Sequence, residues 1–122
     1  MLNLKEIHKD YRGEIYLLEG DLKEDKEITI FSTKSGFARG GCIHRINNEH
    51  NVVLEGEIRY FIGEKEIIMK KGDSAITPRE TAHYFVSLTD SLVIEWGCIP
   101  EEKIEKYKPF RDIVDKINQN HD

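Results

Sequence analysis

The residues best suited to chemistry lie close together in the stretch 36–56. Cys42 and His44 are separated by one residue, so on an extended strand both side chains leave from the same face and can converge on one point. Glu49 follows residues 45–48, a segment without strand alternation whose Asn pair favours a turn back into a second strand. A hairpin of this kind would bring a thiol, an imidazole and a carboxylate around one site, where they could share a metal ion.

The elements that must position these groups belong to one domain. A chain of 122 residues can bury one core but is too short for two, so we expect a single domain over residues 1–122 with its core at about 14–97. The formal net charge of -5 lacks the basic character that nucleic-acid or anionic-membrane binding requires. No apolar N-terminal run and no membrane-length apolar stretch occurs. We therefore expect a cytoplasmic protein with reduced thiols, and neither nucleic acid nor membrane as a partner.

The spacing of apolar residues predicts an all-β fold. Short alternating segments are separated by Gly, Asp and Asn, which is typical of strands joined by tight turns. Gly56 interrupts the apolar pattern of its segment and predicts a bend or bulge there. Besides the strand that carries Cys42 and His44, we expect strands at residues 14–19, 27–33, 51–63 in two parts, 66–70, 82–88 and 91–96.

The pattern changes to a helical one after residue 100. Apolar residues recur at helical spacing behind Pro109, which suits the first position of a helix. These residues are Phe110, Ile113, Val114 and Ile117. We expect a C-terminal helical segment over about 100–118, with a first short helical stretch at 101–107 and a polar, frayed end at 118–122.

Two motifs resemble those of the cupin family. Residues 36–56 follow the pattern Gly, five residues, His-x-His, three or four residues, Glu, six residues, Gly, with Cys42 in place of the first His. Residues 72–87 follow Gly-x5-Pro-x-Gly-x2-His-x3-Asn, with Glu80 and Ser87 as departures. Both motifs, in this order and with fifteen residues between them, resemble an RmlC-like jelly roll. The fold that this implies is a double-stranded β-helix that encloses a small pocket.

The resemblance implies a metal site. Cupin barrels hold a divalent ion with the two His and the Glu of the first motif and the His of the second. The corresponding residues here are Cys42, His44, Glu49 and His83. A thiolate among them would favour Zn²⁺ or Fe²⁺ over Mn²⁺, and if Cys42 turns aside a two-His, one-carboxylate set remains. For a shared ion, the nitrogens of the two His must lie within about 5 Å of each other. The alternative is a barrel without metal, in which these groups bond to one another or to a ligand.

A second resemblance concerns the branch of the family. Residues 10–19, and Arg39-Gly40-Gly41 just before the ligand strand, are similar to the nucleotide-sugar epimerases, the 3,4-ketoisomerases and the cupin domains of capsular polysaccharide enzymes. Those enzymes move a proton at a carbon next to a ketone, which needs a base and a donor to the enolate oxygen. His44 is the candidate base. Cys42 occupies the position of a His base in those enzymes.

Four other residues have both a functional and an ordinary structural interpretation. Arg39 and Arg59 could each bind a phosphate of the substrate, as arginine forks do, or lie on an exposed sheet face. Tyr60 could reach the pocket with its hydroxyl and serve as the catalytic acid. Trp96 fits the core better than a sugar-stacking surface. Cys98, which follows the last strand, we interpret as structural.

Three functions stay open at this point. The first is isomerisation or epimerisation of a small, nucleotide-linked keto-sugar in polysaccharide or deoxysugar biosynthesis. The second is a metal-dependent iron oxygenase, since a two-His, one-carboxylate centre leaves positions for O₂ and substrate. The third is a non-catalytic sugar- or metal-binding module. Cupins of the branch that the chain resembles are usually dimers that pair N-terminal strands, so we expect a homodimer that uses the strand at residues 15–18.

Overall fold

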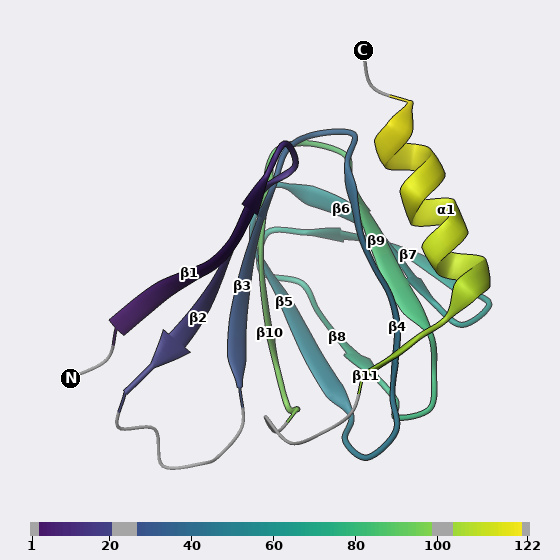
Figure 1. Cartoon of the computed structure of the whole chain (residues 1–122), viewed down its shortest axis with the longest axis horizontal. Helices are drawn as coiled ribbons and strands as arrows, with labels where there is room; N and C mark the ends of the chain where they lie inside the picture. The colour runs from purple at the N-terminus through teal and green to yellow at the C-terminus, as the bar shows by residue number, and fades with distance from the viewer. Residues whose placement is uncertain (1–2, 21–26, 99–103, 121–122) are drawn as a thin grey trace.

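The protein folds as two facing antiparallel sheets with one helix outside them (Figure 1). The computed structural model describes residues 3–20, 27–98 and 104–120. The elements are β1 (Asn3–Asp10), β2 (Gly13–Glu19), β3 (Ile28–Thr33), β4 (Ala38–His44), β5 (Glu49–Glu55), β6 (Glu57–Ile62), β7 (Lys65–Lys70), β8 (Ser74–Thr77), β9 (His83–Ser87), β10 (Ser91–Trp96), β11 (Ile104–Lys106) and α1 (Lys108–Gln119). One sheet has the order β1-β2-β3-β10-β5-β8 and the other β11-β4-β9-β6-β7. The predicted all-β jelly roll with a C-terminal helix is confirmed.

Gly56 lets the chain pass from one sheet to the other. β5 ends just before it in the six-stranded sheet, and β6 begins just after it in the five-stranded sheet. Gly56 has a φ of 82°, in the left-handed region that only glycine adopts without strain. A Cβ at this position would overlap the carbonyl oxygen of Asp90. The predicted bend is therefore a corner between the sheets, and a glycine is needed there for both reasons.

The hydrophobic core joins the two sheets. Val53 and Val93 come from the six-stranded sheet and are fully buried. They pack against Ile58, Tyr60, Met69 and Phe85 from the five-stranded sheet. Burying side chains of this size contributes about 1.5–3 kcal/mol each relative to leaving them exposed. This cluster closes one part of the space between the sheets, and the rest of that space is the cavity described below.

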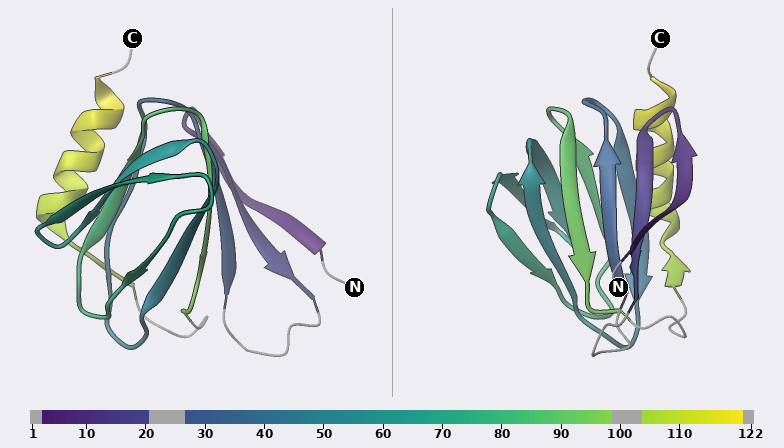
Figure 2. Two further views of the ribbon diagram at one scale, coloured as in Figure 1. Left: turned by 180° about the vertical axis from the view of Figure 1, so that it is seen from behind. Right: turned by 90° about the vertical axis from the view of Figure 1, so that its left-hand side faces the viewer.

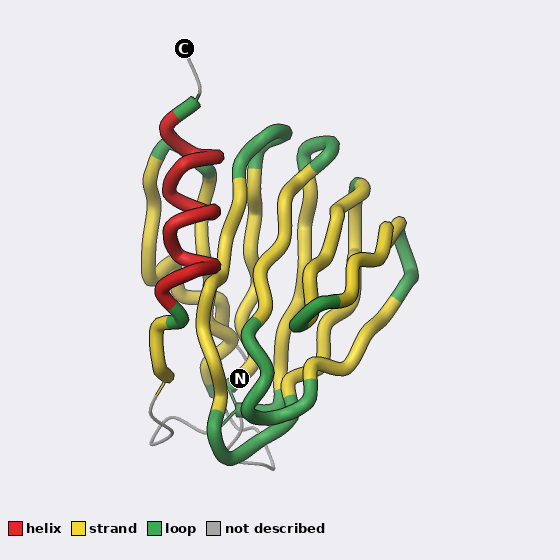
Figure 3. The backbone as a smooth tube through the Cα atoms, turned by 90° about the vertical axis from the view of Figure 1, so that its right-hand side faces the viewer, coloured by secondary structure: helices red, strands yellow, loops and turns green. Residues whose placement is uncertain are grey.

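The helix α1 covers the outer face of the five-stranded sheet at β4 and β9 (Figure 3). Pro109 lies in its first turn, as predicted. Val114 is buried against Ala38 and Tyr84. The predicted frayed end at Asn118 is wrong: its side-chain amide donates to the carbonyl oxygen of Ala38 at 3.0 Å and accepts from the Ala38 N–H at 2.8 Å. In the described part of the chain, no helix is long and apolar enough to cross a membrane.

Residues 104–106 form a strand, so the helical stretch predicted at 101–107 is wrong where the structure describes it; residues 101–103 lie outside the described ranges. β11 pairs antiparallel with the end of β4, and Ile104 lies opposite His44. A three-residue strand gives little periodicity to recognise in a sequence. It matters for the site because it covers the edge of β4 beside His44.

The N-terminal segment forms a strand that the sequence did not indicate. β1 pairs only with β2, and all but its last residue are exposed. β1 and β2 project from the rest of the barrel (Figure 2). β2 has β1 on one side and β3 on the other, so the strand at 15–18, which we expected to be available for pairing, has no open edge. Among the described strands, the edge on this side of the sheet belongs to β1 instead.

Candidate metal centre

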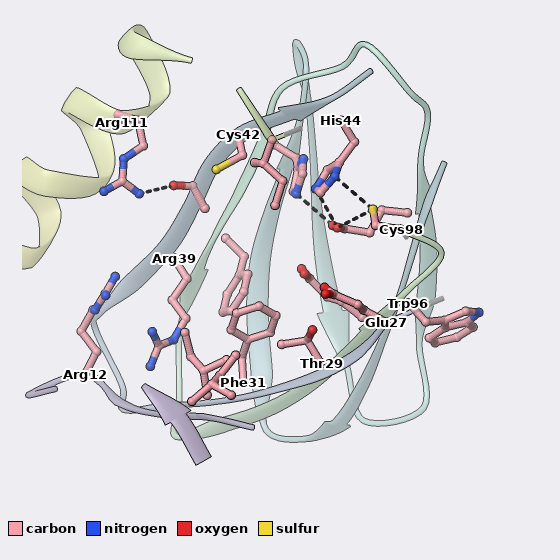
Figure 4. Close-up of a pocket in the computed structure, with 18 residues that line it drawn as sticks. Arg12, Glu27, Thr29, Phe31, Arg39, Cys42, His44, Trp96, Cys98 and Arg111 are labelled. Carbon is pink, nitrogen blue, oxygen red and sulfur yellow. Dashed lines mark hydrogen bonds and ion pairs between the residues drawn. The ribbon is translucent and has the colours of Figure 1, made fainter. Parts of the chain in front are cut away.

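A cavity of about 430 Å³ lies between the two sheets (Figure 4). Small-molecule sites in proteins span roughly 300–1,000 Å³, so the volume suits a compound of sugar size. Residues from both sheets, from the projecting strands β1 and β2 and from α1 line it. Figure 4 shows His44 and Cys98 on one side of the cavity and Arg12, Arg39 and Arg111 on the other.

His44, Glu49 and His83 form one buried cluster in the cavity wall. Nε2 of His44 lies 2.9 Å from Oε2 of Glu49, and Nε2 of His83 lies 2.9 Å from Oε1 of the same carboxylate. The atoms that could bind a metal all lie within 4.8 Å of one another. Each of the three residues is at most 7% exposed. The predicted closeness of the two His is therefore confirmed.

The two sheets meet at this cluster. His44 ends β4 in the five-stranded sheet, and Glu49 begins β5 in the six-stranded sheet. The turn at residues 45–48 therefore links strands of opposite sheets and does not close the hairpin that we predicted. His83 begins β9, where it lies opposite Cys42 of β4. The ligand residues stand at the ends of three rigid strands, which hold them in place.

The donor set fits a divalent metal ion. Burial alone would raise the pKa of Glu49, but its close contacts with His44 and His83 outweigh that effect and lower the pKa, so the carboxylate is charged. Among the described residues, Oε1 of Glu49 makes no well-directed hydrogen bond, although Nε2 of His83 is 2.9 Å away. A buried charged oxygen without a directed donor is unusual. Two imidazoles and one carboxylate are ligands that Zn²⁺ and Fe²⁺ accept, so an ion here would satisfy all three.

Cys98 belongs to this site, although the sequence suggested only a structural role. Its Sγ lies 3.0 Å from Nδ1 of His44 and 3.7 Å from Oε2 of Glu49. A partner on the second ring nitrogen fixes the orientation of a metal-binding imidazole and the nitrogen that faces the metal. Cys98 follows β10 and lies outside both cupin motifs in the sequence, so no motif could have indicated it. It joins the site only through its contacts in space.

We expect Cys98→Ala to lower the affinity for Zn²⁺ by roughly 10–100-fold, the usual cost of removing the partner of a metal-binding histidine. Competition with a chromophoric chelator measures it. Cys98→Ser keeps a hydrogen-bonding atom and should lose less than Cys98→Ala. Cys42→Ala, which removes the other thiol of the cavity, is the control and should bind Zn²⁺ like the wild type. Equal affinity in Cys98→Ala and wild type would show that the thiol does not orient His44.

Cys42 lines the same cavity as His44, as strand alternation predicts, but it is not part of the metal-capable cluster. Burial raises the pKa of its thiol, and the nearby charge of Arg111 only partly opposes that effect. A protonated thiol is a poor metal ligand and behaves as a small apolar group. Three of the four ligands that the resemblance implied, His44, Glu49 and His83, thus form the metal-capable cluster of the described residues.

A β-bulge turns Arg39 into the cavity. The pairing of β4 with β9 shifts between Gly40 and Cys42, and the two glycines at 40 and 41 have φ values of 114° and 94°. The extra residue reverses the alternation of the strand, so Arg39 lines the same cavity as Cys42, three positions away. Arg39 is only 3% exposed. The ordinary structural interpretation, in which Arg39 lies on an exposed sheet face, is therefore wrong.

The structure does not bring Arg59 and Tyr60 to the cavity. Arg59 is exposed on the outer face of β6, and its Nε lies 3.0 Å from Oε1 of Glu66. Tyr60 is fully buried in the core. Its hydroxyl lies 2.9 Å from the Asn51 amide and 2.8 Å from the Thr77 hydroxyl. These two bonds satisfy the buried hydroxyl, and neither residue lines the cavity.

Glu95 is a cavity residue that the sequence did not indicate. From the sequence we interpreted Trp96, its neighbour in β10, as a core residue. Val93 is buried and Glu95 lines the cavity. Trp96 also lines the cavity, is half-buried and stacks on His50 with ring centroids 5.3 Å apart. Burial, together with the charge of Glu49 and a hydrogen bond to it, raises the pKa of Glu95 well above its usual range. Its carboxyl group therefore binds a proton more tightly than an ordinary glutamate does, beside the metal-capable cluster.

The chain belongs to the cupin family, whose domain model matches residues 36–100, more than half of its length. No curated protein matches the sequence.

Solved structures of low sequence identity share the fold. The capsular polysaccharide assembling protein CapF from Staphylococcus aureus is 18% identical with a TM-score of 0.70, over 87% of this chain and 32% of CapF. An RmlC-like cupin from Shewanella frigidimarina is 16% identical with a TM-score of 0.65, over 82% of this chain and 86% of that one. The Fe(II) form of HppE is 16% identical with a TM-score of 0.60, over 80% of this chain and 56% of HppE. The chain thus spans about a third of the length of CapF.

Proposed function

We propose that the protein is a metal-dependent enzyme that isomerises or epimerises a small keto-sugar. The observation that supports it most is that three buried ligand residues, His44, Glu49 and His83, meet within 4.8 Å in the wall of a sugar-sized cavity. The name of CapF, a capsular polysaccharide assembling protein, and the resemblance at residues 10–19 support a nucleotide-linked sugar from polysaccharide or deoxysugar biosynthesis as the substrate.

The residues of the cavity have separate roles in this proposal. His44, Glu49 and His83 would hold Zn²⁺ or Fe²⁺, which would polarise a carbonyl oxygen of the substrate. Both ring nitrogens of His44 have partners, Cys98 on one side and Glu49 on the other, so His44 is a ligand in this proposal and not the base that we predicted. Glu95 lines the cavity with a carboxyl group whose pKa is raised by burial and by the charge of Glu49, and it would exchange a proton with a substrate bound beside it.

The test begins with metal analysis of the freshly purified protein. Samples loaded with Zn²⁺ or Fe²⁺ are then incubated in D₂O with a panel of nucleotide-linked keto-sugars, and NMR follows deuterium uptake at the carbon next to the ketone. We expect about one metal ion per chain and metal-dependent exchange. Metal binding without exchange on any keto-sugar contradicts the isomerase proposal.

A second candidate function is iron-dependent oxygenation. A two-His, one-carboxylate set leaves coordination positions for O₂ and substrate, and it is the donor set found in non-haem iron oxygenases. Substrate-dependent O₂ consumption by the Fe²⁺-loaded protein, without deuterium exchange, would favour this function. A protein that binds metal or sugar but shows neither reaction is a binding module.

We also propose a homodimer, formed through the open edge of β1. Unpaired edge strands present backbone N–H and C=O groups that readily pair with a second chain. Leu4 and Ile7 on this strand are 53% and 49% exposed, so pairing would also cover apolar surface.

We expect light scattering at micromolar concentration to give twice the mass of the 14.2 kDa chain. Leu4→Lys, which places like charges across the interface, should shift the protein toward the monomer. Ile68→Lys changes an equally exposed isoleucine of β7 and serves as the control. A wild-type mass of one chain refutes the dimer.

A further inference from the structure

Three arginines from different elements gather on the side of the cavity away from His44 and Cys98 (Figure 4). Arg12 follows β1, Arg39 belongs to β4 and Arg111 belongs to α1. Arg12 donates to the carbonyl oxygen of Ala38 at 3.3 Å, and Arg111 donates to that of Gly40 at 2.6 Å. These two carbonyls belong to the residues on either side of Arg39. The three side chains are therefore anchored around one short segment of β4.

Arg39 is held rigidly, but one of its guanidinium nitrogens has no hydrogen-bond partner among the described residues. Its Nε donates to the Thr33 hydroxyl at 2.8 Å, and its Nη2 donates to the Ser32 carbonyl oxygen at 3.1 Å. The guanidinium also lies 5.9 Å from the centre of the Phe31 ring. Its Nη1 is buried and has no hydrogen-bond partner within the described ranges. A buried charged group with an unused donor is costly unless something else binds it.

The local charges do not neutralise Arg39. Asp10 pairs with Arg12 at 2.7 Å, and the exposed Asp115 lies 3.5 Å from Arg111. No ion pair within the described part of the chain involves Arg39. Burial, and after it the charge of Arg12, lowers the pKa of Arg39 to about 10, so it stays charged at neutral pH. Asp10 and Glu14 act on Arg39 only through longer-range charge, so its guanidinium stays without a directly paired carboxylate in the described part of the chain.

The backbone of β4 is shaped to let Arg111 approach. A Cβ on Gly41 would lie 2.7 Å from Cδ and 3.0 Å from the backbone nitrogen of Arg111. Only a glycine at this position allows α1 to place Arg111 this close to the cavity. The same bulge that turns Arg39 inward therefore also admits Arg111.

We propose that Arg39, Arg12 and Arg111 form a subsite for a phosphate group. Guanidinium groups from three elements along one side of a cavity suit a tetrahedral oxyanion, whereas a carboxylate is satisfied by a single fork. What this subsite implies about the class of substrate rests on the proposed function. A substrate that spans the cavity would place its phosphate at the arginines and its ketone at His44, Glu49 and His83. Phe31, Phe85 and Ile15 line the apolar part of the cavity.

The test uses the full-length protein after removal of metal with a chelator, so that phosphate cannot bind through an ion. Isothermal titration at constant ionic strength measures the binding of inorganic phosphate, and acetate serves as the comparison anion. We expect phosphate to bind and acetate to bind at least tenfold more weakly. Arg39→Gln should weaken phosphate binding about 10–100-fold, the cost of losing a hydrogen bond to a charged group.

Two further variants keep the test decisive. Arg59→Gln, which changes an exposed arginine outside the cavity, should bind phosphate like the wild type. Arg111→Gln changes a partly exposed residue of α1 and should weaken binding even if Arg39→Gln does not fold. Phosphate affinity that is unchanged in Arg111→Gln and in folded Arg39→Gln, or acetate binding as tight as phosphate binding, overturns the proposal. Because the protein is metal-free, that failure is distinct from failure of the metal-dependent function.

Discussion

Glu49→Gln is expected to remove metal from the protein. The carboxylate lies 2.9 Å from the Nε2 atoms of both His44 and His83, so it is the centre of the proposed ligand set. Gln keeps the shape of the side chain but carries no charge and offers only one oxygen. We expect the affinity for Zn²⁺ to fall by more than about 100-fold, because removing only the hydrogen-bond partner of a metal ligand already costs up to about 100-fold. Chelator competition, with metal analysis of dialysed samples, measures the change.

Cys42→Ser is the matched control for this variant. It changes the cavity residue that the family motif places among the ligands, whereas the structure leaves it outside the cluster. Its metal affinity should equal that of the wild type. If instead Cys42→Ser loses metal and Glu49→Gln retains it, the ligand set would have to include the thiol and exclude the carboxylate, and the site described above would be wrong.

Gly56→Ala is expected to destabilise the fold by about 2–5 kcal/mol, the sum of left-handed strain for a residue with a Cβ and of overpacking. The new Cβ would overlap the carbonyl oxygen of Asp90. Backbone atoms of a packed turn cannot move aside as the end of a flexible side chain can. Since whole domains are stable by only about 5–15 kcal/mol, urea denaturation should show a large shift of the unfolding midpoint.

Gly72→Ala separates the two causes. Gly72 has a φ of 90°, close to the 82° of Gly56, but a Cβ there would meet nothing within 4 Å. Its unfolding free energy should fall by about 1–2 kcal/mol, the strain alone. A loss in Gly56→Ala that is no larger than the loss in Gly72→Ala would mean that the corner between the sheets can relax around a methyl group.

Periodicity predicted the strands that lie across the barrel and missed those at its margins. β5, β6 and β10 alternate between more and less buried residues because one face of each is covered. β1 is exposed along nearly its whole length, so its sequence is charged and shows no inward face. β11 is held as a strand by its pairing with β4, a contact between residues about sixty positions apart that no local pattern can indicate.

The same distinction explains the site. His44, Glu49 and His83 were predictable because a family motif fixes their spacing along the chain. Arg39 was not, because the bulge at the two glycines reverses the side of the strand on which it lies. Glu95 and Cys98 reach the cluster only through the packing of β10 and the segment after it against β4 and β5. Their roles depend on distances in space, which the sequence does not contain.

The place of β10 in its sheet bears on how the chain reaches this structure. β10 lies between β3 and β5, and Ser91 of β10 pairs with Thr33 of β3, a separation of fifty-eight positions (91 minus 33). Until β10 is in place, β1-β2-β3 and β5-β8 are separate pieces with open edges. Such long-range pairing places folding in the slow range, on the order of milliseconds to seconds. During that time β3 and β5 can pair with other chains, so synthesis at low temperature or with chaperones should improve the yield of folded protein.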